Sequence, residues 1–107
     1  MSQIQVTDIE RELVNALKTG EVVLGSKRTI KLVKLGKAKA VVVASNSPPK
    51  VMYEIMYYAR ISKTPVYVYP GTSVELGALC GKPFTVASLA IIDPGSSRIV
   101  DLIEAQG

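Results

Sequence analysis

The apolar residues of this chain follow a helical period of about 3.6 residues in some stretches and form short continuous runs in others. The helical stretches predict a helix over 8–19, one from Ser26 to a cap at Gly36, one after Ser47, a short one between Thr72 and Gly81, and one from Ser96 through Ile103. The continuous runs predict strands at Val22–Leu24, Ala40–Ala44, Val66–Tyr69 and Val86–Ile92.

Helices and strands alternate throughout, which predicts an α/β fold: a three-layer α/β/α sandwich around a mixed four-stranded sheet, in one domain over residues 1–107. Ala40–Ala44 is apolar on both faces, as is typical of a central strand covered by helices on both sides. The residues expected to cap the N-termini of helices are Thr7, Ser47, Thr72 and Ser96.

Helical spacing also predicts which side chains face the core. In the helix after Ser47, the expected buried residues are Val51, Met52, Ile55, Tyr58 and Ala59. The residues of that helix expected to point outward are Tyr53, Glu54, Tyr57 and Arg60. In the short helix, the expected buried residues are Val74, Leu76 and Leu79.

Composition narrows the class of protein. The chain has 107 residues, of which 48% are hydrophobic and 21% charged, so it suits one compact domain and excludes intrinsic disorder. The lone cysteine, Cys80, cannot form an intramolecular disulfide, which favours a reducing compartment. No signal-like segment and no run long enough to cross a bilayer is visible, so we expect a soluble cytoplasmic protein that does not engage membranes.

Basic residues are concentrated in one part of the chain. Seven of the thirteen Lys and Arg residues lie between Val22 and Lys50, and no Asp or Glu lies between Glu21 and Glu54. A row of lysines on a helix is most often a solvated face. Such a face usually also carries Glu residues, which stabilise the helix by pairing with Lys four positions away. The missing acids favour contact with an anionic polymer, in line with a net charge of +4.

The start of the basic helix is a predicted anion site. The turn at Gly25 leaves the first helical N–H groups without partners, and the helix dipole makes that end positive. Lys27 and Arg28 stand at this end, where cations are locally unfavourable by roughly a few tenths of a kcal/mol. An anionic partner would explain their position.

The residues do not support catalysis. The chain has no histidine, and Cys80 lies in an apolar helix without an imidazole partner, so it is expected to be a structural thiol. Gly20 and Gly25 have the spacing of a phosphate loop, but Ser26-Lys27 reverses the required order and a strand is predicted between the glycines. We expect no cofactor and no metal site.

Three loops of the predicted sandwich can open on one edge of the sheet. The residues they would collect are Ser26, Lys27, Arg28, Lys31, Asn46, Lys50, Lys82, Pro83, Phe84 and Thr85. Phe84, the only phenylalanine, can fill the core or stack on an unpaired base beside the cations. Asn46 can contact base edges or stabilise a turn through an Asx bond.

Two long stretches of the chain closely resemble a known family. The stretches GSKRTIKLVKLGKAKAVVVASNSPP and EIMYYARISKTPVYVYPGTSVELGALCGKPFTVASLAIIDPG are similar to the archaeal and eukaryotic L-thirty-e family of large-subunit ribosomal proteins. That family belongs to the L-seven-Ae superfamily, which binds kink-turn RNA. The resemblance covers nearly all of Val22 to Ile99. It implies the α/β/α sandwich, no enzymatic activity, and a ribosomal protein that is a monomer outside the ribosome.

The resemblance also implies an RNA-binding surface and partners. Its residues here are Gly25, Ser26, Lys27, Arg28, Lys31, Asn46 with the neighbouring Pro48 and Pro49, and Phe84 with Val86. Lys50 and Thr85, which the predicted loops collect, complete the predicted RNA-binding site. The implied partners are a kink-turn of ribosomal RNA and other proteins of the large subunit. Related superfamily members carry Gly-x-Asn-Glu where this chain has Gly25-Ser26-Lys27-Arg28, so their asparagine contacts to bases are not expected here.

The sequence leaves three possible functions open for this protein. The first is a structural ribosomal protein, which the basic surface and the resemblance favour. The second is an RNA-binding regulator or a subunit of a non-ribosomal ribonucleoprotein that binds kink-turns. The third is a small nucleotide-using enzyme, which the missing histidine disfavours.

Overall fold

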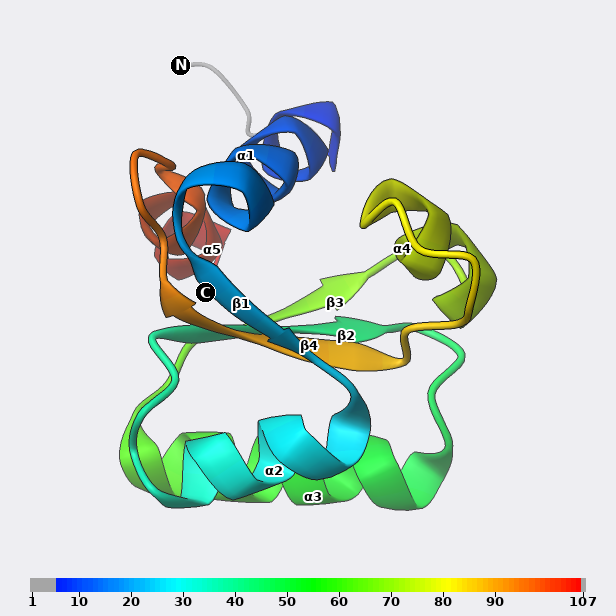
Figure 1. Ribbon diagram of the computed structural model, residues 1–107. Coiled ribbons are helices and arrows are strands. Elements are labelled where there is room, and N and C mark those ends of the chain that lie inside the picture. Colours follow the sequence, from blue (N-terminus) through cyan, green and yellow to red (C-terminus); the bar gives the residue numbers. More distant parts are fainter. Residues whose placement is uncertain (1–5, 107) are drawn as a thin grey trace.

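The computed structural model describes residues 6–106, with side chains from 8 to 105. Five helices and four strands alternate along it: α1 Val6–Thr19, β1 Glu21–Leu24, α2 Ser26–Lys34, β2 Ala40–Ala44, α3 Pro49–Ser62, β3 Val66–Tyr69, α4 Ser73–Leu79, β4 Ser88–Asp93 and α5 Ile99–Gln106. They form three layers, with α2 and α3 below the sheet in Figure 1 and α1, α4 and α5 above it. The predicted sandwich is confirmed.

The strands lie in the order β1-β4-β2-β3. β4 pairs antiparallel with both β1 and β2, whereas β2 and β3 are parallel, so the sheet is mixed as predicted. β2 is central and every residue of it is buried. Its continuous apolar run, AVVVA, therefore reflects helices packed on both of its faces.

Each face of the sheet has its own core. Alternate residues of β2 point to opposite sides, so Val42 belongs to the core under α1, α4 and α5, and Val41 to the core over α2 and α3. In the second core, the buried residues of α2 and α3 include Val33, Ile55 and Ala59. Val51, Met52 and Tyr58 pack against this core but are only partly buried. The predicted inward face of α3 is thus correct in direction.

Three of the four predicted caps are wrong. α1 begins at Val6, so Thr7, whose side chain lies outside the described residues, stands within the helix. The N-cap position of α3 is Pro48, and the Ser47 hydroxyl instead donates 2.9 Å to the carbonyl of Ala87. Ahead of α5, Ser97 rather than Ser96 accepts the N–H of Ile99.

The fourth cap is confirmed, because Thr72 and Glu75 form a reciprocal capping box at the start of α4. Two other expectations around α4 are wrong. Val74 is 63% exposed, since α4 presents only Leu76 and Leu79 to the core. β4 begins at Ser88 rather than Val86, because the Val86 N–H donates to Ser73 of α4 and not to a neighbouring strand.

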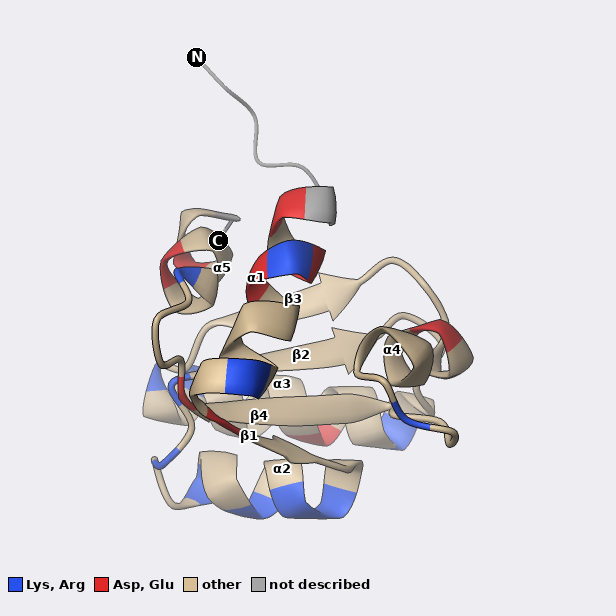
Figure 2. Ribbon diagram, turned by 45° about the horizontal axis from the view of Figure 1, so that its top comes forward, with Lys and Arg blue, Asp and Glu red and all other residues tan. Residues whose placement is uncertain are grey.

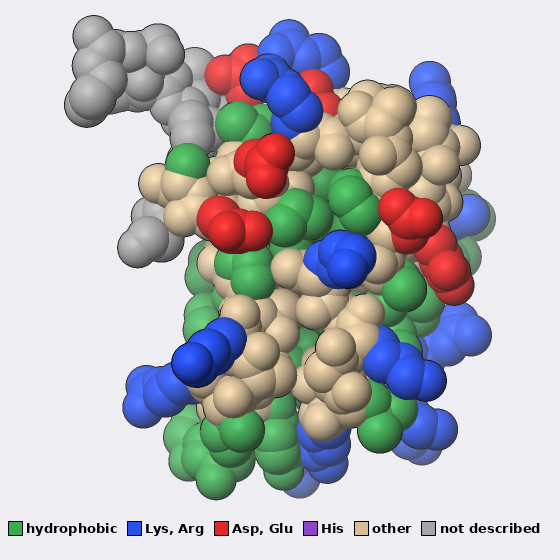
Figure 3. All heavy atoms as spheres, turned by 90° about the vertical axis from the view of Figure 1, so that its left-hand side faces the viewer, with side chains coloured by type: hydrophobic (Ala, Val, Ile, Leu, Met, Phe, Trp, Pro, Cys, Tyr) green, Lys and Arg blue, Asp and Glu red, His purple; other side chains and the backbone are tan. Residues whose placement is uncertain are grey.

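The two helical layers differ in charge. Nine of the thirteen Lys and Arg residues lie between Lys27 and Lys63, together with one of the nine acidic residues, Glu54. In Figure 2, blue accordingly dominates α2 and α3, whereas most of the red lies on α1, α4 and α5. On the face seen in Figure 3, the acidic side chains all lie above the α2–α3 layer. The protein is thus electrostatically polarised across its sheet.

Candidate nucleic-acid interface

The ends of four strands gather at one edge of the sheet, on the right in Figure 1. β1, β2 and β3 end there, and β4, which is antiparallel to β1 and β2, begins there. The edge therefore carries the turn at Gly25, the loop after Ala44 and the loop before Ser88. The predicted convergence of these three loops is confirmed.

Hydrogen bonds fix the three loops to one another. The carbonyl of Ala87 accepts both the Ala44 N–H at 2.8 Å and the Ser47 hydroxyl at 2.9 Å. The carbonyl of Ser88 accepts the Gly25 N–H at 2.9 Å, and the Ser88 hydroxyl donates to Ser26 Oγ at 2.7 Å. The start of β4 thus holds the other two loops at a fixed distance.

The segment that leads into α4 is a fourth part of this edge, which the sequence pattern did not predict. Asn46 Oδ1 accepts the backbone N–H of Ser73, the first residue of α4, at 2.8 Å. The Ser45 hydroxyl donates 3.0 Å to the carbonyl of Gly71. Part of the signal was present in the sequence, because the Thr72 capping box follows β3 directly. The parallel pairing with β2, which brings the end of β3 to this edge, was decided by the tertiary structure.

Two hollows lie beside these loops. The first is lined by Gly25, Arg28, Lys82, Phe84 and Thr85, together with strand β1 and Val86. Phe84 is 57% exposed, which excludes the interpretation that it fills the core. The structure therefore places an exposed aromatic ring and two cations around one concave surface.

The second hollow runs between α2 and α3. Its lining residues are Ser26, Lys27, Ile30, Lys31, Lys34, Lys50, Val51 and Glu54. Four lysines converge on it from the two helices, and Glu54 is its only acid. Lys34 was not among the predicted site residues. The resulting hollow has a strong positive charge.

Not every predicted site residue presents a side chain to this surface. Val86 is 2% exposed and packs into the core under α1 and α4, and its N–H is bonded to Ser73. It can only position the loop. Asn46 and Pro48 are exposed. The side-chain oxygen of Asn46, Oδ1, already accepts the Ser73 N–H, so the side-chain NH2 group is what remains for a ligand.

Gly25 gives the edge its geometry. It precedes α2 with φ of 110°, a conformation that residues with a side chain rarely adopt. No side chain caps the first turn of α2, so its N–H groups face the same region as Lys27 and Arg28. The predicted anion site at this helix end has the required local structure.

Cys80 and the segment from Gly20 to Gly25 lack the surroundings of reactive or phosphate-binding sites. The described residues contain no group of three potential metal-ligating side chains among His, Cys, Asp and Glu. Burial raises the pKa of the Cys80 thiol, which disfavours the reactive thiolate. The residues between Gly20 and Gly25 form β1, so they cannot cradle a phosphate. No described helix combines the length and apolar character needed to span a membrane.

Comparison with known proteins agrees with this geometry. A family model described as the ribosomal protein L7Ae/L30e/S12e/Gadd45 family matches residues 7–101. The large ribosomal subunit protein eL30 of Methanothermobacter thermautotrophicus is 56% identical over 96 residues, which cover 90% of this chain and 98% of that protein. The eL30 protein of Sulfurisphaera tokodaii is 50% identical over 100 residues, or 94% of each chain. The chain therefore belongs to the ribosomal protein L7Ae/L30e/S12e/Gadd45 family and to its L30e branch, as the sequence resemblance had implied.

Proposed function

We propose that this ribosomal protein of the large subunit binds a kink-turn, or a similarly sharp bend, in an internal loop of ribosomal RNA. The single observation that carries the proposal is the shared edge formed by the Gly25 turn, the Asn46 loop and the Phe84 loop. As a member of its family it is not an enzyme, and it is located in the cytoplasm as part of the ribosome.

Phosphates would be bound at the start of α2. Lys27, Arg28 and Lys31 lie on the first turns of that helix and are exposed, next to its N–H groups. A kinked RNA brings phosphates from two strands close together, so it gains more from a dense group of cations than a straight duplex does. Lys50 adds a further cation from α3 across the same hollow.

Selection of the bent shape would come from the loops. An exposed Phe84 ring beside Arg28 and Lys82 can stack on a base that the bend has extruded. The Asn46 amide can donate to a base edge while its oxygen remains bonded to Ser73. Gly25, Ser26 and Val86 fix the backbone of these loops, and Pro48 and Thr85 are exposed on the same surface. We further propose that the protein is a monomer outside the ribosome.

The test is binding of the full-length protein to a kink-turn hairpin and to a straight duplex of equal length, across a salt series. We expect preferential binding to the bent RNA and an affinity that falls steeply with salt. Equal, weak binding to both RNAs would contradict recognition of the bend. In that case the basic surface would be a general phosphate contact.

A second function, in a non-ribosomal ribonucleoprotein or as an RNA-binding regulator, would use the same edge. Sedimentation of cell extracts separates the two. Co-migration with large subunits supports the ribosomal function, whereas a pool bound to RNA in fractions free of ribosomes supports the alternative. The Gly25-Ser26-Lys27-Arg28 sequence favours the ribosomal function.

A further inference from the structure

The outer face of α3 carries exposed aromatic rings that the kink-turn site does not use. Tyr53 is 69% exposed and Tyr57, one helical turn later, is 49% exposed. Their rings are stacked, with centroids 6.1 Å apart and an angle of 16° between the planes. Two large parallel rings in solvent are unusual on a small protein, which indicates a binding surface.

These rings are held in position. Tyr57 meets Tyr58 edge to face, with centroids 5.1 Å apart and planes at 81°. Lys34 of α2 places its Nζ 4.7 Å from the centroid of the Tyr58 ring. Stacking of a ligand on Tyr57 would therefore cost little side-chain entropy of the protein, because the ring is already supported.

The charge around the rings is positive. Lys50, Arg60 and Lys63 are exposed along or at the end of α3, and Lys34 lies beside it on α2. None of these four cations has an ion-pair partner among the described side chains. The only acid of this layer is Glu54. The surface thus suits a partner that combines flat apolar groups with negative charge.

This face extends away from the edge of the sheet along α3. Tyr57 lies seven residues beyond Lys50, or about 10 Å along the helix axis at 1.5 Å per residue. The α4 and Phe84 segments lie on the far side of the sheet from α3 (Figure 1). A ligand at Tyr57 can therefore be bound together with a kinked RNA at the loops.

We propose that Tyr53 and Tyr57 form a second RNA-binding surface, which takes unpaired bases of single-stranded RNA. The bases stack on the tyrosine rings, and Lys34 and Arg60 neutralise the neighbouring phosphates. A nucleotide supplies both the ring and the charge that this face is built to accept. This proposal goes beyond kink-turn binding and does not depend on it.

The test uses the full-length protein and a single-stranded oligouridylate of about ten nucleotides, with binding followed at low salt by fluorescence anisotropy of the labelled RNA. We expect the Tyr53→Ala/Tyr57→Ala variant to bind roughly tenfold more weakly. The Tyr53→Phe/Tyr57→Phe variant should retain the affinity because it keeps the rings. Affinity for the kink-turn hairpin should be unchanged in both variants.

Matched control residues flank the two tyrosines on the exposed side of α3. Met56 and Ile61 are 36% and 64% exposed but have no aromatic ring, so the Met56→Ala/Ile61→Ala variant should bind the oligonucleotide as the natural chain does. An equal loss in this variant would identify a general apolar patch, suited to a protein partner, and would overturn the proposal. So would binding of the oligonucleotide that is unaffected by loss of the tyrosines, or no binding at all.

Failure here and failure of the proposed function are distinguishable. A protein that selects the kink-turn hairpin but does not use its tyrosines for the oligonucleotide retains the proposed function alone. A protein that binds the oligonucleotide through its tyrosines, yet binds bent and straight RNA equally, retains only the second surface. Thermal unfolding of each variant confirms that the chain is folded.

Discussion

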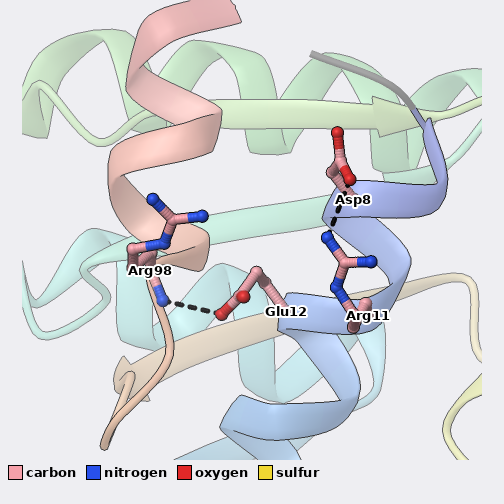
Figure 4. Close-up of polar contacts among 4 residues, drawn as sticks. All are labelled: Asp8, Arg11, Glu12 and Arg98. Carbon is pink, nitrogen blue, oxygen red and sulfur yellow. Dashed lines mark hydrogen bonds and ion pairs between the residues drawn. The ribbon is translucent and has the colours of Figure 1, made fainter.

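The carboxylate of Glu12 in α1 accepts a hydrogen bond from the backbone N–H of Arg98, 2.9 Å away at the start of α5 (Figure 4). The hydroxyl of Ser97 lies 2.9 Å from the same carboxylate oxygen and 2.6 Å from the backbone carbonyl of Glu12. These contacts join two helices that are far apart in the sequence. They stand on the acidic side of the sheet, away from the candidate RNA surface.

Glu12 should make stability depend on pH. The hydrogen bond from the Arg98 N–H, followed by that of Ser97, lowers the pKa of the Glu12 carboxyl below its ordinary value. Because the folded chain favours the charged form, this stabilisation is present above the ordinary pKa and is lost as pH falls through the lowered one. We expect Glu12→Gln to destabilise the protein by about 1 kcal/mol at neutral pH and by almost nothing in acid.

Urea unfolding of the two proteins at neutral and at acidic pH measures this difference. Arg11→Ala is the control, since the Asp8–Arg11 ion pair in Figure 4 is exposed, with side chains 69% and 35% accessible for Arg11 and Asp8. It should cost less than about 0.5 kcal/mol. A Glu12→Gln effect of the same size at both pH values would contradict the charged hydrogen bond as its cause.

Lys31 should contribute affinity without specificity. Its ammonium group is exposed on α2 beside Lys27 and Lys50, in the positively charged hollow. We expect Lys31→Gln to weaken binding to bent and straight RNA alike and to reduce the slope of log affinity against log salt by about one unit. Lys18→Gln, which removes an exposed cation of α1, should change neither quantity. A loss confined to the bent RNA would instead make Lys31 a specificity residue.

Phe84 should contribute specificity. It is 57% exposed, so Phe84→Ala removes little buried area and should leave the thermal midpoint almost unchanged. Loss of stacking should cost about 1 to 3 kcal/mol of binding to the kink-turn hairpin and much less for the duplex. Leu35→Ala is the matched control, because Leu35 is also 57% exposed but lies at the C-terminal end of α2, away from the Gly25 turn. An unchanged preference for the bent RNA would remove Phe84 from the proposed site.

Asn46 should have a structural and a binding effect that can be separated. Asn46→Ala removes the acceptor of the Ser73 N–H, and we expect it to cost about 1 kcal/mol of unfolding free energy. Asn46→Asp keeps the acceptor, so it should retain that stability. Both variants lose the amide NH2 group and should bind the kink-turn hairpin more weakly. Full RNA affinity in Asn46→Ala would show that the amide makes no base contact.

Much of the fold could be predicted because its signals are local. The run Ala40–Ala44 identified the central strand, and the Thr72–Glu75 spacing identified the start of α4. The errors occurred where a distant segment competed for a side chain. Ser47 bonds to Ala87, forty residues away in the sequence, instead of capping α3, and no local pattern contains that partner. Val86 was predicted to lie in a strand because its neighbours are apolar, but its N–H donates to the carbonyl of Ser73 in α4.

The candidate site divides in the same way. Lysine spacing along α2 and the glycine before it indicated an anion-binding helix end, because both follow from helical geometry alone. Whether Phe84 is buried or exposed depends on how α4 and β1 surround its loop, and only the structure decided it. The hydrogen bond from the Ser73 N–H of α4 to Asn46 could not be predicted from the sequence either.

By itself, the sequence determined the order of helices and strands, the central position of β2 and the concentration of cations between Lys27 and Lys63. These features depend on residue type and on spacing within one element. The tertiary structure alone decided which loops touch, that the Asn46 oxygen is occupied and that Tyr53 and Tyr57 form a supported stack. Hydrogen bonds and ring contacts require atoms to meet at a few ångströms, and the packing of α2, α3 and α4 on the sheet sets those distances.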